Sequence, residues 1–199
     1  MLKIDAKRLT WRTLLIGALL LAGVWQIGEA AYIHLKAQLA QQLLRTAWEK
    51  TRAGEKEVKP WPWADTWPVA RLRVPSQGVD LYVLAGASGR TLAFGPGHLS
   101  GTPLPGQTGN SVLSAHRDTH FDFVKKLAAG NELIVESADG KETSYRISTM
   151  LVVDKHDTWV TRNAEDSRLT LITCYPFDAI IPGGPLRYVV TAEAGNAGV

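Results

Sequence analysis

The single cysteine of this chain, Cys174, is the residue whose chemistry most needs an explanation. It has no second cysteine to pair with, so it cannot form an intramolecular disulfide. A thiol is nucleophilic as its thiolate, and a free thiol with a pKa of about 8.5 needs a basic or cationic neighbour to reach that form at neutral pH. The alternative is a buried and inert side chain, since free cysteines are among the most buried residue types. The residues that can stand beside Cys174 decide between the two.

A histidine and an arginine lie in segments that can accompany the thiol. His116 stands where the apolar run 111–115 gives way to a polar segment, a position that projects a side chain from a strand into a cleft. Arg187 begins another apolar segment 13 residues after Cys174 (187 − 174), and an arginine there can donate to an oxyanion. A nucleophile, a proton carrier and an oxyanion donor are the parts of acyl-transfer catalysis. Taken singly, each also has a structural reading, as a solvated histidine or a paired surface arginine.

The sequence around these residues is more specific than their types. Residues 170–174 read Thr-Leu-Ile-Thr-Cys and match the sortase signature Thr-Leu-x-Thr-Cys. Residues 186–190 resemble the arginine-bearing strand that follows this signature in sortases. His116 stands in Ser-Ala-His-Arg, which is similar to the histidine segment of the same family, with Ala115 in place of the commoner glycine. The resemblance covers residues 71–191 and is strongest to the sortases of Gram-negative bacteria (class GN, marine proteobacterial), through Cys-Tyr-Pro-Phe and a Trp-rich lead-in.

The resemblance implies a cysteine transpeptidase or peptidase. Cys174 would attack the carbonyl of a threonine-like residue in a C-terminal sorting signal and form a thioacyl-enzyme, which an amine or water resolves. His116 would protonate the leaving amine and later deprotonate the incoming nucleophile, while Arg187 donates hydrogen bonds to the oxyanion. Thr173 is a second-tier candidate for contact with the substrate or oxyanion, and a β-branched strand residue is the equal alternative.

Three polar residues near these segments stay outside the predicted site. Asp118 can orient His116, but a helix-capping role explains it better, and Thr119 can cap the same helix. His120 can lie on the cleft rim or cover the helix start. Asp157 precedes the cysteine strand, where a contact with the sorting signal and ordinary turn chemistry are both open. We expect neither a metal nor a cofactor, because the histidines and carboxylates show no ligand spacing and the acidic groups that hold calcium in some sortases have no match here.

Short strands separated by turns are expected to position these residues. The alternation and punctuation predict eight strands and one helix, Phe121–Ala129, ended by Gly130. The Asp139-Gly140 pair predicts a hairpin. The predicted strands are 69–74, 79–84, 90–94, 111–115, 132–136, 143–153, 168–173 and 186–191. The fold class is therefore mainly β, a sortase-like eight-stranded β-barrel with short helices.

An N-terminal membrane anchor precedes this domain. The apolar run Leu14–Trp25 follows a cluster of Lys and Arg and continues with interruptions to Ile33, close to the roughly 20 residues that a spanning helix needs. A cleaved signal peptide is the alternative, but no clean Ala-x-Ala follows the run, so an uncleaved anchor is favoured. The basic residues keep the N-terminus in the cytoplasm, and the catalytic domain faces outward from the inner (cytoplasmic) membrane, into the periplasm in a Gram-negative cell.

This reading gives five regions along the chain. They are a cytoplasmic basic N-terminus (1–12), a transmembrane signal-anchor (13–33), a stalk helix and Trp/Pro-rich linker (34–68), a sortase-like catalytic domain (69–193) and a C-terminal tail (194–199). Leu35, Leu39, Leu43 and Trp48 recur at helical spacing in the stalk. The tryptophans of the linker are expected to pack against the domain.

The expected partners are a secreted protein with a C-terminal sorting signal, an amine acceptor and the membrane, with the enzyme as a monomer. A net charge of +3 is too small to indicate nucleic acid. An L,D-transpeptidase is one alternative. That family carries a Ser-x-Gly-Cys-x-Arg pattern, whereas Cys174 is followed by Tyr-Pro-Phe. A membrane-anchored β-barrel that only binds an envelope partner, with Cys174 buried, is the non-enzymatic alternative.

Overall fold

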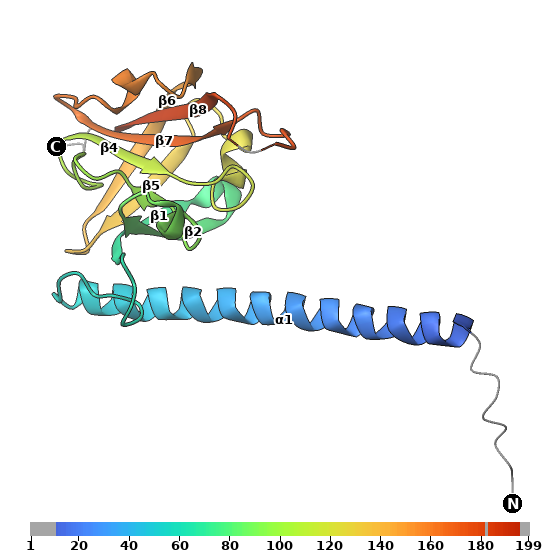
Figure 1. Ribbon diagram of the computed structural model, residues 1–199. Coiled ribbons are helices and arrows are strands. Elements are labelled where there is room, and N and C mark those ends of the chain that lie inside the picture. Colours follow the sequence, from blue (N-terminus) through green and yellow to red (C-terminus); the bar gives the residue numbers. More distant parts are fainter. Residues whose placement is uncertain (1–10, 182, 196–199) are drawn as a thin grey trace, which may run out of the picture. The chain divides into compact units, whose positions relative to one another are not determined.

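The computed structural model describes residues 11–181 and 183–195. Its residues fall into two compact units, divided between Ala40 and Gln41. The second unit is built on a closed barrel with the strand order β1-β2-β3-β4-β7-β8-β6-β5 (Figure 1). The strands are β1 Pro68–Val74, β2 Val79–Ala85, β3 Gly97–His98, β4 Gly109–Ser114, β5 Glu132–Ser137, β6 Glu142–Asp154, β7 Ser167–Tyr175 and β8 Leu186–Ala194. The predicted mainly β, eight-stranded barrel is confirmed.

Within residues 11–181 and 183–195, five helices accompany the strands. They are α1 Trp11–Arg52, α2 Gly89–Leu92 and the 3-10 helices η1 Pro75–Gln77, η2 Asp122–Lys126 and η3 Thr158–Thr161. The strand predicted at 90–94 is wrong, because this segment forms α2, where the Ser88 hydroxyl accepts from the Thr91 amide at 3.2 Å and caps the turn. The eighth strand is instead β3, whose two residues are too few to show an alternating pattern.

The helix predicted at Phe121–Ala129 is a shorter 3-10 helix, η2. Phe121 occupies its N-cap position, so the expected capping by Asp118 or Thr119 is wrong. Within η2, Phe123 and Val124 are buried, and Phe121 and Leu127, which cap its two ends, are buried as well. The predicted end at Gly130 is wrong as well, because η2 ends at Lys126 and the extended Leu127 is its C-cap. Gly130 lies in the turn that follows, with a φ of 83° and an amide that donates to the Ile147 carbonyl at 2.8 Å.

The hydrophobic core fills the inside of the barrel. Alternate residues on the strands point into it, and on neighbouring strands these include Leu113 of β4, Leu169 and Leu171 of β7, and Val190 of β8. The hairpin predicted at Asp139-Gly140 joins β5 to β6, where the Gly140 amide donates to the Ser137 carbonyl at 2.9 Å. Because side chains alternate along a strand, the residues between these core positions point to the outer face of the barrel.

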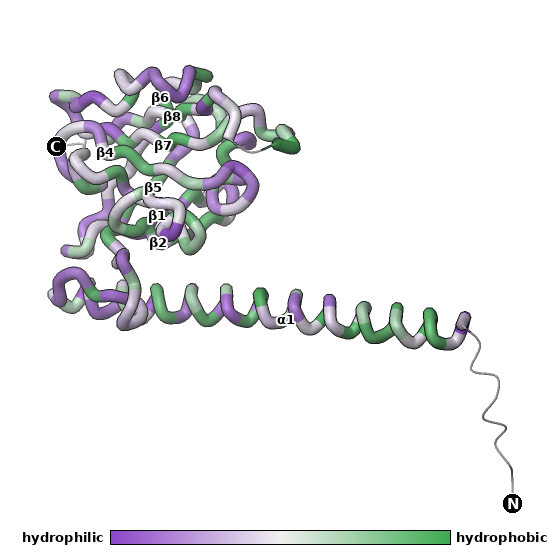
Figure 2. The backbone as a smooth tube through the Cα atoms, in the orientation of Figure 1, coloured by the Kyte–Doolittle hydropathy of each residue, from purple (hydrophilic) through white to green (hydrophobic). Residues whose placement is uncertain are grey.

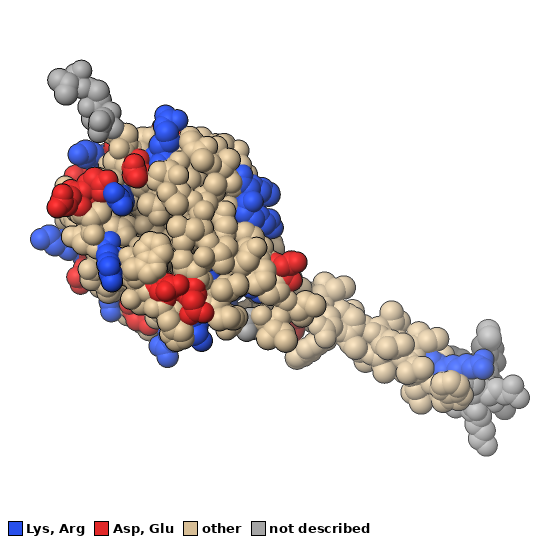
Figure 3. All heavy atoms as spheres, turned by 90° about the horizontal axis from the view of Figure 1, so that it is seen from above, with Lys and Arg blue, Asp and Glu red and all other residues tan. Residues whose placement is uncertain are grey.

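Helix α1 carries both the predicted anchor and the predicted stalk in one run of 42 residues. It is long and apolar enough to cross a membrane, with a window of mean hydropathy 1.7. Figure 2 shows hydrophobic residues along its N-terminal part, and in Figure 3 charged side chains are scattered over the barrel while the visible length of the helix is mostly uncharged. This helix fits a membrane anchor.

The last turns of α1 belong to the barrel unit, which begins at Gln41. Leu44, Ala47, Trp48 and Thr51 are buried at the i, i+3, i+4, i+7 spacing of one helix face. Gln41 donates to the Phe94 carbonyl at 2.8 Å, and Arg52 pairs with the buried Glu136. These contacts make the end of the helix part of the barrel's outer wall.

The Trp-rich segment that follows α1 packs in part on the barrel. Trp61 meets Phe94 edge-on with 4.8 Å between the ring centroids, and the Thr66 hydroxyl donates to the Ala85 carbonyl at 2.7 Å. Trp63, by contrast, is 83% exposed. The predicted packing therefore holds for Trp61 and is wrong for Trp63.

Candidate active site

The register between β4 and β7 places the candidate histidine beside the candidate nucleophile. These strands run parallel with a constant offset of 58 residues, up to the last pair Ser114 and Ile172 (172 − 114). The ladder continues past this pair, because the Ala115 amide donates to the Ile172 carbonyl at 3.3 Å. His116 and Cys174 are also 58 positions apart (174 − 116), so the same register aligns them.

Arg187 lies on the other side of the cysteine. Strands β7 and β8 are antiparallel, and Cys174 pairs directly with Arg187. Residues paired across neighbouring strands have their side chains on the same face of the sheet. Cys174 of β7 and Arg187 of β8 are thus neighbours, and His116 follows the end of β4 by two residues. In this register the three residues form a row at one end of β4, β7 and β8, which are adjacent in the barrel (Figure 1).

This row lies on the outer face of the barrel. Leu171 and Thr173, which precede Cys174 on β7, point inward and are 1% and 2% exposed. Cys174 is half-buried and His116 is exposed. A fully buried cysteine is therefore excluded, and the thiol is within reach of a ligand that covers this face.

Thr173 connects the cysteine strand to the histidine segment. Its hydroxyl donates to the Ala115 carbonyl at 2.7 Å, and both residues are buried. The hydroxyl thus has a structural partner one residue before His116. Of the two readings that the sequence left open, this contact supports the structural one.

The guanidinium of Arg187 is held at the start of β8. Its Nη1 donates to the carbonyls of Gly184 and Leu186, each at 2.8 Å. A guanidinium has five N–H groups, and these two bonds use only the pair on Nη1. The remaining three can donate to an anion that forms near Cys174.

Arg117 joins the histidine segment to the segment after the cysteine, and no sequence pattern predicts this role. Its Nη1 donates to the Pro176 carbonyl at 2.7 Å and its Nη2 to the Ala179 carbonyl at 2.5 Å. The same segment carries Phe177, which packs edge-on against Tyr188 of β8 with centroids 5.0 Å apart. The backbone on both sides of the row is therefore braced.

The polar residues kept outside the predicted site lie in different surroundings. Burial lowers the pKa of His120, and the nearby His116 acts in the same direction, while a hydrogen bond to the Ala93 backbone opposes the shift. Asp118 is exposed. The Asp157 carboxylate accepts from the Asp154 amide at 3.0 Å, which supports the turn reading of that residue.

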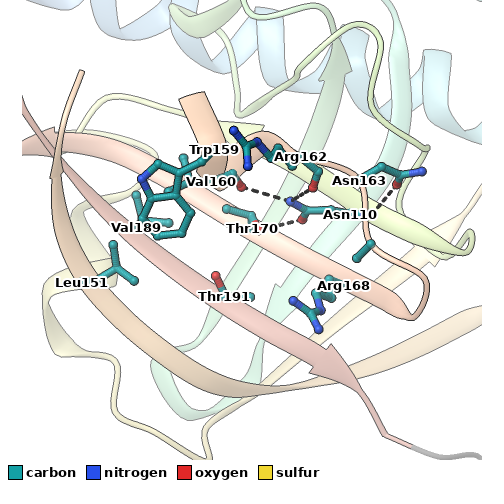
Figure 4. Close-up of a pocket in the computed structure, with 11 residues that line it drawn as sticks. Asn110, Leu151, Trp159, Val160, Arg162, Asn163, Arg168, Thr170, Val189 and Thr191 are labelled. Atoms are coloured by element: carbon teal, nitrogen blue, oxygen red, sulfur yellow. Dashed lines mark hydrogen bonds between the residues drawn. The ribbon is translucent and has the colours of Figure 1, made fainter. Parts of the chain in front are cut away.

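A pocket lies on the same strands, β7 and β8, and none of its lining residues belongs to the row (Figure 4). On β7 the pocket is lined by Thr170, four residues before Cys174, and on β8 by Val189, two residues after Arg187. At about 3.3 Å per residue, Thr170 lies about 13 Å from Cys174 along the strand. The wall opposite the strands is the turn around η3. The full lining is Asn110, Leu151, Trp159, Val160, Arg162, Asn163, Ala164, Arg168, Thr170, Val189 and Thr191.

The pocket is apolar at one end and carries an arginine at the other. Trp159, Leu151 and Val189 gather at one end, and Arg168 stands at the other (Figure 4). On β8, Val189 is two residues from Arg187, while Thr191 is four residues away. Since Arg187 is in the row with Cys174, the apolar end of the pocket is the end nearer Cys174. An extended peptide laid along β7 would place an apolar side chain in this end when its reacting carbonyl is at the thiol.

Comparisons with known proteins agree with this architecture. A family model for the sortase domain matches residues 72–195. The chain is 35% identical over 120 residues to Sortase D of Bacillus subtilis (strain 168), a match that spans 60% of this chain and 60% of that relative's length.

Two solved structures share the fold. A Clostridium perfringens sortase D5 transpeptidase has a TM-score of 0.65 at 22% identity, covering 79% of this chain and 98% of that one. A Clostridium perfringens sortase C with the C-terminal cell wall sorting motif has a TM-score of 0.60 at 23% identity, covering 81% and 90%. Since the family model spans more than half of the 199 residues, the chain belongs to the sortase family and its barrel is the sortase fold.

Proposed function

We propose that this sortase is a cysteine transpeptidase that cleaves a C-terminal sorting signal through a thioacyl intermediate on Cys174. The observation that supports this most is the row formed by Cys174 of β7, its cross-strand partner Arg187 of β8, and His116 just beyond the end of β4. Thiol, proton carrier and cationic donor lie on one accessible face, with the nucleophile in the middle. Membership of the sortase family sets aside the L,D-transpeptidase alternative.

The reaction proceeds in two acyl transfers. The Cys174 thiolate adds to the carbonyl carbon of a threonine-like residue, and Arg187 donates hydrogen bonds to the oxyanion. Protonated His116 gives its proton to the leaving amine, so that the C–N bond breaks and a thioester remains. An incoming amine then attacks this thioester, passes its proton to His116 and releases the cysteine as a thiolate. Water in place of the amine gives hydrolysis.

The peptide lies in the pocket of Figure 4. Its threonine-like residue reaches Cys174, and an apolar residue upstream packs on Trp159, Leu151 and Val189. One solved sortase C with a similar fold contains a sorting motif, which supports a peptide of this kind as the ligand. The donor substrate would be a secreted protein, and the acceptor a primary amine.

Helix α1 places the reaction at a membrane. We propose that residues 13–33 form the signal-anchor in the inner membrane and that the catalytic domain at 69–193 faces outward, into the periplasm of a Gram-negative cell. Assignment to the Gram-negative group rests on Cys-Tyr-Pro-Phe at 174–177 and the Trp-rich lead-in. The chain would act as a monomer.

Peptide turnover tests this function. A library of peptides with a central threonine, incubated with the protein and an amine such as triglycine, should yield cleaved and amine-linked products. Mass spectrometry should detect an acyl adduct, which can form only on Cys174 if it is a thioester. Cys174→Ala and His116→Ala should abolish turnover while far-UV circular dichroism stays unchanged. Full turnover by a folded Cys174→Ala protein would reject the mechanism.

A further inference from the structure

One buried amide side chain holds a wall of the peptide pocket. Asn110 of β4 is 5% exposed, and its Nδ2 donates to the carbonyls of Val160 and Arg162, each at 3.0 Å. Its Oδ1 accepts from the Thr170 hydroxyl of β7 at 2.7 Å. Its backbone amide donates to the Asn163 side chain at 3.1 Å. Figure 4 shows these bonds converging from the strands on the turn around η3.

The turn itself has little apolar burial to fix it. Trp159, the residue of η3 that forms the apolar end of the pocket, is 49% exposed, and Arg162 is exposed as well. Since burial of apolar surface is the main favourable contribution to folding, a turn that buries little depends on its hydrogen bonds for a fixed position. Asn110 makes most of the hydrogen bonds that join the turn to the strands.

The neighbouring residue, Gly109, independently supports a close contact between β4 and this turn. A Cβ atom at Gly109 would lie 2.3 Å from Asn163 Oδ1, and the φ of this glycine is 107°. Its amide donates to the Asp166 carbonyl at 3.0 Å. The chain thus uses a glycine followed by an asparagine to bring the turn against the strand.

We propose that Asn110 is a positioning residue that fixes the turn 158–163 before substrate arrives, so that the peptide pocket exists without a ligand. Peptide binding and thiol chemistry then depend on different residues of the same face of the barrel. Loss of the Asn110 side chain weakens peptide binding, because only a fraction of the molecules then carries a formed pocket. It leaves the thiol chemistry intact, because Cys174 lies about 13 Å along β7 from Thr170, the strand residue that bonds to the Asn110 side chain. This inference rests on the proposed peptide substrate only in its kinetic part.

The test compares Asn110→Ala with Thr170→Val and a control. Thr170→Val removes one bond to the Asn110 side chain and leaves both Nδ2 donors in place. Asn131→Ala is the matched control, since Asn131 accepts from the Ala128 amide in a turn before β5, on the opposite side of the barrel. Amide hydrogen exchange of residues 157–164 should accelerate about tenfold or more in Asn110→Ala, less in Thr170→Val and not at all in Asn131→Ala.

Kinetics then separate positioning from general destabilisation. With the best peptide from the threonine library, Asn110→Ala should raise KM about tenfold with kcat within about threefold of the parent. The rate at which iodoacetamide alkylates Cys174 should stay the same. Unchanged exchange at 157–164, or a loss confined to kcat, overturns the proposal. If the parent cleaves no peptide, the proposed function fails, while the exchange arm still decides the role of Asn110. Should Asn110→Ala not fold, Thr170→Val carries the same test with smaller expected changes.

Discussion

Replacing Thr173 by valine isolates the link between the two strands that carry His116 and Cys174. Valine keeps the branched shape but removes the hydroxyl that donates to the Ala115 carbonyl at 2.7 Å. A typical hydrogen bond contributes about 1 kcal/mol, and a buried acceptor that loses its donor costs about 1–3 kcal/mol. Because both residues are buried, we expect a loss of about 1–3 kcal/mol in the free energy of unfolding.

Activity should fall further than this loss explains. Ala115 directly precedes His116, so a carbonyl that turns away to find another donor also displaces the histidine. At 25 °C a protein with several kcal/mol of stability remains almost fully folded after a loss of this size, so any fall in kcat reports geometry rather than unfolding. We expect kcat to fall about tenfold, since small misplacements of catalytic groups have effects of this order or larger.

Urea denaturation and peptide turnover measure the two effects on the same samples. Thr173→Ser keeps the hydroxyl and should recover most of the lost kcat. Thr149→Val, at an exposed position of β6, supplies a threonine-to-valine change away from the row. If Thr173→Val unfolds at the same urea concentration as Thr149→Val, with unchanged kcat, the Thr173–Ala115 contact does not hold the histidine and the reasoning fails.

Three further variants test other parts of the structure. Arg117→Ala removes both hydrogen bonds to the carbonyls of segment 176–179. We expect kcat to fall about tenfold and a protease to cut at 176–185 faster than in the parent. Equal protease resistance would show that Arg117 does not hold this segment. Gly97→Ala should lower the free energy of unfolding by about 2 kcal/mol or more in urea titrations, because its Cβ would lie 2.3 Å from the Gly86 carbonyl oxygen; parent-like stability would show that β3 can shift. His120 has a lowered pKa in the fold, so the unfolded chain binds its proton first and stability should decline as pH falls below about 6.5. His120→Gln should flatten that decline between about pH 7 and 5, and an unchanged slope would refute the assignment.

The sequence predicted the long strands well, because their residues alternate between core and surface. The hairpin at Asp139-Gly140 and the two strands that carry Cys174 and Arg187 are of this kind. The misread segments are those where local pattern and tertiary context differ. The pattern of segment 90–94 predicts a strand that stops before Gly95, yet Ser88 caps a helical turn there, and the predicted helix at 121–129 is a shorter 3-10 helix, with Phe121 and Leu127 buried at its two caps.

Some residues of the candidate site could be predicted from the sequence, and others could not. His116, Cys174 and Arg187 could be named because each stands in a recognisable local sequence. Arg117 and Asn110 could not, because their partners are main-chain atoms far away in the chain. Arg117 bonds to carbonyls 59 and 62 positions on, and Asn110 to carbonyls 50 and 52 positions on. A hydrogen bond to a backbone atom places no demand on the type of the partner residue, so it leaves no paired pattern in the sequence.

The row at the centre of the site is a product of strand register, and this explains where its supports lie. A shift of one residue between β4 and β7 would turn Cys174 toward the core and away from the face that carries His116. Three side-chain hydrogen bonds oppose such a shift. Thr173 donates to the Ala115 carbonyl at one end of the ladder, and Thr170 donates to Asn110 near the other end. Arg117 donates to the segment beyond Cys174. The residues that fix the register are thus the same ones that brace the row and the pocket. Changes at Thr173 and Asn110 should therefore be distinguishable by which end of the ladder loosens, with catalysis affected at the first and peptide binding at the second.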